Sequence, residues 1–332
     1  MRKKSRSKRW RIVLVLLVVL VSFVWVTNSS FFVKGDGSRP ELLAHRGLGQ
    51  TFDLEGVKWN TNTAAIIHEP RHYYLENTLE GIGAAIEFGA DIVEFDVRMT
   101  KDGQLAVFHD YLLDYRTDGK GHVSTYTMDE LRKLDIGYGY TADGGQTYPF
   151  RGKCIGRMPS VDEVLTAFPD MVWLIHIKDG GIKAAKVLET HLLNLDGDWQ
   201  SRIAIYGNEK AVMYFRGRYP RIKTLTKNLM VRAFWIYALI GWTGYIPDSF
   251  KNLEMHIPLN YARLFWGWPH RFLRRVKEAN SRFVLVNGSG GFSSGFDDSE
   301  ALQRIPENYS GCIWTDRIDV VAPLIINMQR QH

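Results

Sequence analysis

Two carboxylates, Glu94 and Asp96, lie two positions apart inside an apolar run that ends at Val97. Side chains alternate between the two faces of a strand, so we expect both acids on one face and the apolar residues between them on the other. At a separation of about 5 Å and an effective dielectric constant of about 20, the two charges repel each other by roughly 3 kcal/mol. A divalent cation would remove this cost, and hard carboxylate oxygens suit Mg²⁺ or Ca²⁺. The pair therefore predicts a metal site.

Histidines and cationic residues lie at the ends of other apolar runs. His45 and Arg46 end one run, His109 ends another, and His176 and Lys178 lie two positions apart at the end of a third. Two imidazoles, on His45 and His109, can serve as general base and general acid, while Arg46 and Lys178 offer the cationic donors that phosphate oxygens require. A metal, two histidines and two cations together predict cleavage of a phosphodiester.

These side chains need a scaffold that gathers the ends of several strands. The chain after residue 41 alternates strand-like and helix-like segments, a pattern typical of a parallel α/β fold. We expect strands at 41–44, 91–97, 104–108, 172–178, 203–206, 282–286 and 311–314, with 221–225 and 255–257 as alternatives for the sixth strand. We expect helices at 77–88, 127–134, 160–168, 182–195, 209–218 and 269–280, three of them opened by capping boxes at Asn77/Glu80, Thr127/Glu130 and Ser160/Glu163. Eight β/α units predict a (β/α)8 barrel, in which active sites lie at the carboxyl ends of the strands.

Two long segments interrupt this pattern. Residues 48–75 separate the first strand from its helix by more than a usual connection, and residues 227–251 form an apolar, aromatic insertion that includes Trp235 and Trp242. Two interpretations of the second insertion are open. It is either a lid or extra helix buried against the barrel, or an interfacial membrane contact near the mouth of the active site that Trp266 and Trp268 extend.

The motifs that carry this chemistry resemble those of the glycerophosphodiester phosphodiesterases. The resemblance rests on His-Arg-Gly at 45–47, Glu-Asn-Thr at 76–78, Glu-Phe-Asp at 94–96, Thr-Lys-Asp-Gly at 100–103 and His-Asp at 109–110. Weaker matches continue as far as Thr-Asp-Arg at 315–317, so that the likeness covers nearly all of the chain from Glu41 onward. The motifs within residues 44–110 indicate this family only when they are taken together.

The resemblance implies a (β/α)8 barrel with a small insertion after the third strand, here at 111–158. It implies hydrolysis of a glycerophosphodiester to glycerol 3-phosphate and an alcohol. The amino-terminal apolar run and the aromatic insertion suggest small-molecule or lipid substrates at or near a membrane, including lysophospholipids cleaved in phospholipase D fashion or glycerophosphate polymers of a cell envelope. His45 and His109 would take the acid and base roles, and Glu94 and Asp96 would hold the metal. Glu76 would orient Arg46 or approach the metal.

One position departs from the family pattern. The family usually has Glu-x-Lys on the fourth strand, with the glutamate as a third metal ligand, whereas this chain has His176-Ile177-Lys178. A neutral imidazole can also bind a metal, but it shifts the preference from Mg²⁺ or Ca²⁺ toward Mn²⁺ or Zn²⁺. Two alternatives to hydrolysis therefore stay open: a weak or inactive barrel that binds phosphodiesters or lipid head groups, and a lyase that releases a cyclic phosphate.

The amino-terminal region predicts a membrane protein. A basic tail at 1–11 carries seven of the Lys and Arg residues and precedes an apolar run at 12–33, a linker at 34–40 and the barrel at 41–332. The run is long enough to cross a bilayer, and the positive flank places the amino terminus in the cytoplasm and the barrel outside. The run is either a retained anchor or a cleaved signal, which would make the protein secreted. Without the tail the formal net charge of +6 falls to about −1, which argues against a nucleic-acid partner, and no protein partner is inferred.

The two cysteines leave a similar choice open. Cys154 and Cys312 could pair in an oxidising compartment, or each could be an isolated packed thiol.

Overall fold

The computed structural model describes residues 2–33, 35, 37–288 and 294–330. Within these residues, eight parallel strands form a nearly closed barrel: β1 (Glu41–Ala44), β2 (Ile92–Met99), β4 (Val172–Ile177), β5 (Ile203–Gly207), β6 (Lys223–Leu225), β7 (Glu254–Pro258), β8 (Arg282–Val286) and β9 (Cys312–Thr315). The strands follow the order β6-β5-β4-β2-β1-β9-β8-β7, and a parallel bridge between Thr224 and Leu253 joins the two ends of this order. The predicted (β/α)8 barrel is confirmed.

The strand assignment differs from the expectation in two places. The predicted third strand is β3 (Leu105–Val107), which pairs antiparallel with the end of β2 and lies outside the barrel wall. Both alternatives for the sixth strand are barrel strands, since 221–225 contains β6 and 255–257 lies in β7. Because Lys101-Asp102-Gly103 forms a tight turn, the chain folds straight back on β2 and has no room for the crossover helix that a parallel strand needs.

The helices that cover the barrel are α2 (Leu79–Phe88), α4 (Val161–Ala167), α5 (Gly181–Leu192), α7 (Glu209–Arg218), α8 (Lys227–Ile240), α10 (His270–Glu278), α11 (Ser299–Gln303) and α12 (Ile318–Arg330). Short helices α3 (Met128–Leu131), α6 (Trp199–Arg202) and α9 (Leu259–Ala262) lie in the connections. The predicted capping boxes of α3 and α4 are present. The cap predicted at Asn77 is wrong, because Thr78 caps α2 by accepting from the backbone N–H of Gly81.

Strand alternation sorts the side chains into two layers. Along β2, Val93, Phe95 and Val97 pack outward in the layer between strands and helices, while Ile92 belongs to the core inside the barrel. Glu94 and Asp96 share the inner face with Ile92 and are fully buried. The barrel therefore presents both acids to its interior near the carboxyl end of β2.

The segments 48–75 and 111–158 pack together beside this end of the barrel. Their shared core includes Ala64 and Ile67 from the first segment and Leu113, Tyr140 and Phe150 from the second. Hydrogen bonds from Ile67 N to Thr141 O and from Thr141 N to Ala64 O tie the two segments. Cys154 lies in this core, whereas Cys312 lies inside the barrel, and both are free thiols. The disulfide interpretation is therefore wrong.

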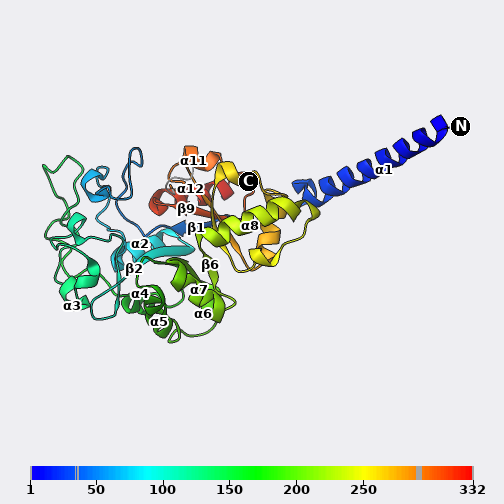
Figure 1. Ribbon diagram of the computed structural model, residues 1–332. Helices are drawn as coiled ribbons and strands as arrows, with labels where there is room; N and C mark the ends of the chain where they lie inside the picture. The colour runs from blue at the N-terminus through cyan, green and yellow to red at the C-terminus, as the bar shows by residue number, and fades with distance from the viewer. Residues whose placement is uncertain (1, 34, 36, 289–293, 331–332) are drawn as a thin grey trace.

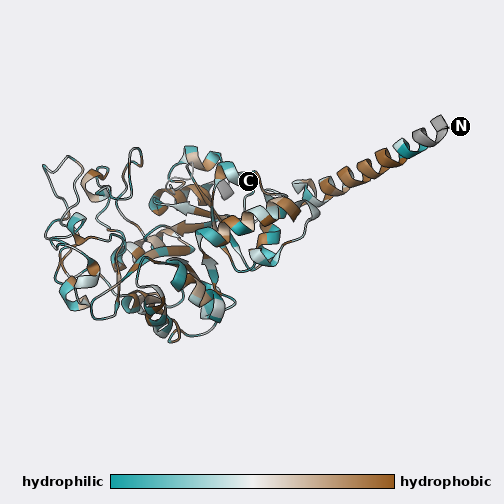
Figure 2. Cartoon of the chain, viewed as in Figure 1, coloured by the Kyte–Doolittle hydropathy of each residue, from teal (hydrophilic) through white to brown (hydrophobic). Residues whose placement is uncertain are grey.

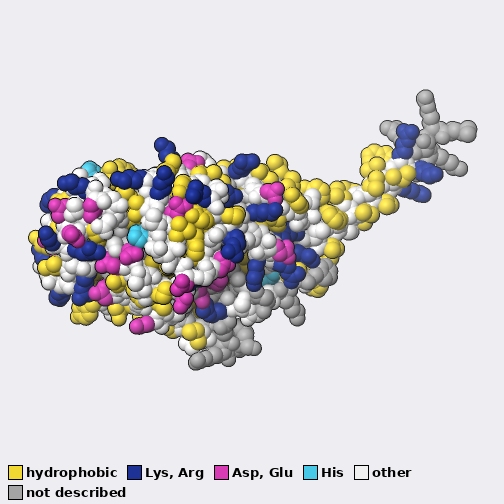
Figure 3. Space-filling view, turned by 90° about the horizontal axis from the view of Figure 1, so that it is seen from below, with side chains coloured by type: hydrophobic (Ala, Val, Ile, Leu, Met, Phe, Trp, Pro, Cys, Tyr) yellow, Lys and Arg dark blue, Asp and Glu magenta, His cyan; other side chains and the backbone are white. Residues whose placement is uncertain are grey.

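The helix α1 (Arg2–Asn28) projects from the barrel at the end opposite the segment 111–158, which contains α3 and is called the α3 segment below (Figure 1). Its stretch Lys8–Asn28 has 21 residues, is long and apolar enough to cross a membrane, and has none of its most apolar window buried. Figure 2 shows the apolar character along most of the helix, and Figure 3 shows its exposed apolar surface with basic side chains near the amino-terminal tip.

Candidate active site

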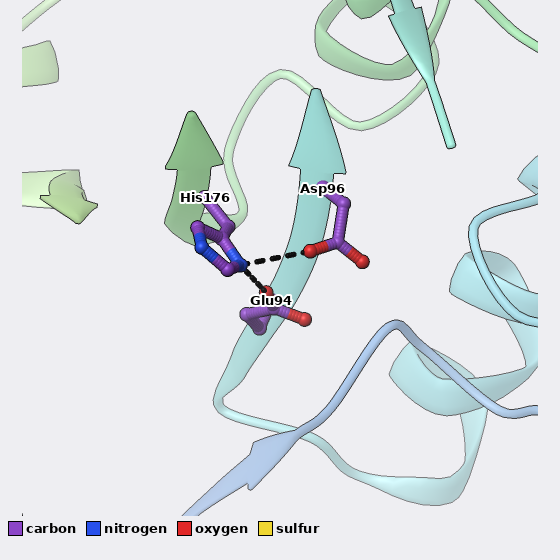
Figure 4. A group of neighbouring side chains, drawn as sticks. All are labelled: Glu94, Asp96 and His176. Carbon is purple, nitrogen blue, oxygen red and sulfur yellow. Dashed lines mark ion pairs between the residues drawn. The ribbon is translucent and has the colours of Figure 1, made fainter. Parts of the chain in front are cut away.

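Three side chains converge at the carboxyl ends of β2 and β4. Glu94 and Asp96 come from β2 and His176 from β4, which pair in parallel with Asp96 opposite His176. Figure 4 shows the imidazole turned toward both carboxylates, with His176 Nδ1 at 2.9 Å from Asp96 Oδ1 and 3.8 Å from Glu94 Oε1. One potential ligand atom from each of the three residues lies within 4.8 Å of the others. This cluster is the predicted metal site with its predicted third member.

Asp96 is the most heavily contacted acid of the cluster. Its Oδ1 lies 3.2 Å from Lys178 Nζ, and its Oδ2 accepts from Asn77 Nδ2 at 3.0 Å and lies 3.4 Å from Arg46 Nε. Burial opposes the charge, but Lys178, His109 and Arg46 together hold the pKa of Asp96 well below its usual range. Asp96 is therefore ionised at neutral pH.

Glu94 has the opposite electrostatic balance. Burial and the neighbouring charge of Asp96 raise the pKa of its carboxyl group, and they outweigh a hydrogen bond of 2.6 Å from the hydroxyl of Tyr206 to Glu94 Oε1. The second oxygen, Oε2, accepts from the backbone N–H of Arg46 at 2.9 Å. The repulsion predicted from the sequence thus appears as a raised pKa on one member of the pair.

These residues fit a divalent cation. A cation would relieve the repulsion that raises the pKa of Glu94, and the two carboxylates supply the oxygen ligands that Mg²⁺, Ca²⁺ and Mn²⁺ accept. Burial lowers the pKa of His176 to about 4, so the imidazole is neutral at pH 7 and keeps a lone pair for a metal. The ring stacks on Tyr206 with centroids 3.9 Å apart, which fixes its plane against the two carboxylates.

His45 follows β1 and is oriented by the last strand of the barrel. Its Nδ1 lies 2.6 Å from Asp316 Oδ1, and its Nε2 accepts from Arg46 Nε at 3.1 Å. The ring proton must therefore lie on Nδ1 and be donated to Asp316. The acid reaches His45 because β9 pairs with β1.

His109 follows β3 and has a carboxylate partner of its own. Its Nδ1 lies 2.6 Å from Asp110 Oδ1, and Asp110 Oδ2 lies 3.1 Å from Arg116 Nε. Burial and the charge of Arg46 lower the pKa of His109 to about 3, so the free site holds a neutral imidazole at pH 7. The strand β2 lies between β1 and β3 and places its two acids between His45 and His109.

Arg46 connects the two halves of the site. Its backbone has a φ of 57°, in the left-handed region, and the following Gly47 has a φ of 74°. A Cβ at Gly47 would lie 3.0 Å from the backbone of Gly81, so the turn needs glycine there. Arg46 Nη1 donates to Glu76 Oε1 at 3.0 Å, an acid that also pairs with Arg116 at 3.2 Å. Glu76 therefore orients Arg46, one of its two predicted roles.

A cavity of about 620 Å³ opens above these residues. His45, Arg46, Glu76, His109, His176 and Lys178 line its floor, and the two buried acids of β2 lie directly beneath. Its outer wall comes from the two packed segments, with apolar side chains that include Phe52, Leu54, Val57, Trp59 and Tyr111. Among the described residues, none from 227–255 lines the cavity. The idea of an apolar insertion at the active-site mouth therefore fails for 227–251, and 48–75 occupies that place instead.

All eight predicted site residues thus belong to one connected cluster. Sequence reasoning missed the parts of Asp316, Tyr206 and Asn77 as partners of His45, Glu94 and Asp96. Asp316 and Tyr206 each lie at the end of a predicted strand, which was the available signal.

Comparison with known protein families shows which family this chain belongs to. Residues 45–236, more than half of the chain, match the model of the glycerophosphoryl diester phosphodiesterase family. The chain belongs to this family. A glycerophosphodiester phosphodiesterase of Caldanaerobacter subterraneus subsp. tengcongensis is 39% identical over 113 residues, which cover 34% of this chain and 42% of that protein. Lysophospholipase D GDPD3 of Mus musculus is 26% identical over 223 residues, 65% of this chain and 64% of that protein.

Solved structures of family members share the fold. The glycerophosphodiester phosphodiesterase of Agrobacterium tumefaciens str. C58 superposes with a TM-score of 0.57 at 19% identity, covering 86% of this chain and 99% of that one. An Oleispira antarctica phosphodiesterase, solved in complex with the product sn-glycerol-3-phosphate, gives a TM-score of 0.55 at 18% identity, with 87% and 97% covered. At this identity the likeness supports the barrel fold alone.

Proposed function

We propose that this protein hydrolyses glycerophosphodiesters to glycerol 3-phosphate and an alcohol. One observation carries the proposal: two imidazoles, each hydrogen-bonded to its own carboxylate, line one cavity above a cluster of two buried acids and a neutral histidine. The relatives are named as a glycerophosphodiester phosphodiesterase and a lysophospholipase D, which supports the same reaction. The matched segments span 42% and 60% of the length of the first two relatives, so the activity of the whole protein is inferred here rather than transferred.

We assign the following roles to residues of the chain. Arg46 and Lys178 bind the phosphate oxygens and offset their charge. One of His45 and His109 takes a proton from the attacking water, and the other gives a proton to the leaving alkoxide. Asp316 and Asp110 hold the two rings by their Nδ1 protons, so that each Nε2 serves for proton exchange. The P–O bond to water forms, the P–O bond to the alcohol breaks, and one proton moves from water to the alcohol.

Glu94, Asp96 and His176 would hold the divalent cation of this family. When bound, the cation supplies positive charge that stabilises the negative charge developing on the phosphate oxygens. Oxygen ligands favour Mg²⁺ or Ca²⁺, and the imidazole adds Mn²⁺ or Zn²⁺ as candidates.

An assay of products tests this function. Purified full-length protein is incubated with glycerophosphocholine, glycerophosphoethanolamine or a lysophospholipid, each with Mg²⁺, Ca²⁺ or Mn²⁺ in turn. Glycerol 3-phosphate from the two glycerophosphodiesters, or lysophosphatidic acid from the lysophospholipid, supports hydrolysis when detected by phosphorus NMR, whereas a cyclic phosphate as the final product supports the lyase. The double variant H45A/H109A should be inactive while its circular dichroism is unchanged. A wild type that is inert with every metal but binds the diesters would support the binding barrel.

We also propose that α1 anchors the protein. The division into a basic tail at 1–11, an anchor at 12–33, a linker at 34–40 and a catalytic barrel at 41–332 stays a prediction, and residues 34, 36 and 331–332 lie outside the described part. The length and composition of α1 and the basic residues before it support a single-pass protein with a cytoplasmic amino terminus and the barrel outside. Carbonate extraction of membranes and protease protection of the barrel test this topology.

A further inference from the structure

We propose that the barrel rests on the bilayer with the end that carries α1, so that the catalytic cavity opens away from the membrane. The surface in question is a collar formed by the exposed apolar side chains Trp235, Leu239, Tyr245, Leu264 and Trp266. The occupant of this surface is the lipid–water interface. Three observations support the proposal: the hydrogen bonds that join α1 to the barrel, the apolar and basic composition of the collar, and the position of the catalytic cavity at the other end of the barrel.

The junction between α1 and the barrel is built from several hydrogen bonds. Arg275, a buried residue of α10, donates to Thr27 O at 2.6 Å and to Asn28 Oδ1 at 3.1 Å. Asn28 Nδ2 donates to the carbonyl oxygen of Trp242 at 2.7 Å, just beyond α8. Ser30 Oγ donates to the carbonyl oxygen of Gly267 at 3.3 Å. Because α1 docks before any linker begins, its direction fixes the face of the barrel that meets the bilayer.

The collar surrounds this junction. Trp235 and Leu239 lie four residues apart on one side of α8 and are 62% and 73% exposed, while Ala233 and Tyr237 on the other side are buried. Leu264 is 63% exposed. The indole of Trp266 donates to Ala238 O at 3.0 Å, which holds it beside Leu239. The surface of a soluble monomeric protein rarely carries so many large apolar side chains close together. Such a patch marks a contact with another protein or with a membrane.

The charge of these segments favours the membrane over another protein. Residues 226–247 contain two basic residues and no acid, and residues 259–277 contain five basic residues and no acid. Arg263 and Arg274 are exposed. Tryptophan and tyrosine bodies with basic side chains at their edge are the composition that binds the interface of an anionic bilayer.

The cavity lies at the other end of the barrel. The helix α8 starts directly after the carboxyl end of β6 and runs back for about 21 Å, so that its last turn and the junction lie toward the strand starts. A second cavity at the strand starts is lined by Val33 from beyond α1 together with Glu41 and Arg282. The catalytic cavity is instead lined by residues that follow the strand ends, and Figure 1 shows α1 and the α3 segment at opposite ends of the molecule.

The inference goes beyond the proposed hydrolysis and holds or fails without it. If both hold, the site receives diesters from the aqueous side, either dissolved or projecting from a polymer, rather than phospholipids lying in the same bilayer.

Site-directed fluorescence of the full chain tests this orientation. The variants L239C and L264C place an environment-sensitive NBD probe in the collar, W59C places it at the cavity rim, and V19C places it in α1. I155C is the matched control, since Ile155 is 60% exposed and belongs to the segment 111–158, which packs beside the strand ends and away from α1 (Figure 1). Both native cysteines are buried, and labelling of the unmutated protein gives the background. Each protein is reconstituted in vesicles of phosphatidylcholine and phosphatidylglycerol, and its fold is checked by circular dichroism.

We expect spin-labelled lipids to quench the probes at 19, 239 and 264 several-fold more strongly than the probe at 155. The probes at 59 and 155 should instead be quenched by aqueous iodide. Collar probes that behave like the control while position 19 is quenched by lipid would overturn the proposal, because the barrel would then stand away from the bilayer. Lipid quenching at 59, a probe at 19 that lipid does not reach, or collar probes that neither quencher reaches would also overturn it.

Discussion

The ring of His45 and the carboxylate of Asp316 are separated in sequence by 271 residues, yet His45 Nδ1 lies 2.6 Å from Asp316 Oδ1. They meet at the seam where β1 and β9, the first and last strands of the chain, pair in parallel. The contact fixes the proton of His45 on Nδ1 and leaves Nε2 as the nitrogen that can exchange a proton with substrate or water. The closure of the barrel is therefore what orients this histidine for the proton transfer proposed for it.

Replacing Asp316 by asparagine should lower kcat by about 10- to 1,000-fold, because an amide no longer selects the tautomer or stabilises the imidazolium. We expect KM to change little, since Asp316 makes no predicted contact with the phosphate. Steady-state kinetics of D316N and of the unmutated protein, measured at several pH values, give both parameters. An unchanged kcat and pH profile in D316N would show that the contact is only structural.

Removal of divalent metals should abolish turnover, and the identity of the third ligand should set the metal preference. Restoring the carboxylate in H176E should raise the affinity for Mg²⁺ or Ca²⁺ relative to Mn²⁺, because it adds a hard, charged oxygen ligand. Titration calorimetry with each metal measures this preference. Turnover that survives exhaustive chelation, or an H176E variant with the same metal affinities as the wild type, would contradict the role of this cluster.

The hydrogen bond from Tyr206 to Glu94 should contribute to stability because Glu94 is fully buried and Tyr206 is partly buried. The change Y206F leaves Glu94 Oε1 without this donor and should lower the free energy of unfolding by about 1–3 kcal/mol. Y214F is the matched control, since the hydroxyl of Tyr214 donates to Glu189 at 2.7 Å and Glu189 keeps two further donors in Arg218 and Tyr219, so that the loss should cost less than about 1 kcal/mol. Urea denaturation of both variants, with metal removed, gives the comparison; equal losses would refute the buried bond.

Asp297 should make stability fall as the pH rises. Burial and the neighbouring charge of Asp316 raise the pKa of Asp297 to about 7, above its usual value near 4. Between these values the folded state binds more protons than the unfolded state, so this contribution is present at low pH and is lost as the pH rises through about 7.

The variant D297N removes this charge while its side-chain oxygen can still accept from Thr315 Oγ1 and Asp316 N. We expect D297N to raise Tm more at pH 8 than at pH 5, by about 2–4 °C. Thermal unfolding at the two pH values measures the difference. A gain of the same size at both pH values would mean that Asp297 is ionised throughout and that the coupling to Asp316 is weak.

The local sequence determined the strands, the helices and the inward face of β2. Alternation around Glu94 and Asp96 sufficed to place both acids inside, because a strand has a side-chain period of two whatever it pairs with. The capping boxes of α3 and α4 were likewise predictable, since they involve residues three positions apart. The motifs at 45–47, 94–96 and 109–110 were enough to indicate both the family and the members of the site.

Only the tertiary structure decided which strands are neighbours and therefore which side chains touch. The short turn at 101–103 was a sign that β3 folds back on β2. Nothing in the local pattern shows, however, that β9 delivers Asp316 to His45 or that Tyr206 supports Glu94, since strand ends alone do not say which ends are neighbours. The placement of 227–251 beside α1 rather than over the cavity also depends on barrel closure, because helices packed around a closed ring end at the strand starts. Periodicity along one chain is a local property, whereas these contacts depend on the order and register of strands far apart in sequence, which the packing of the whole barrel sets.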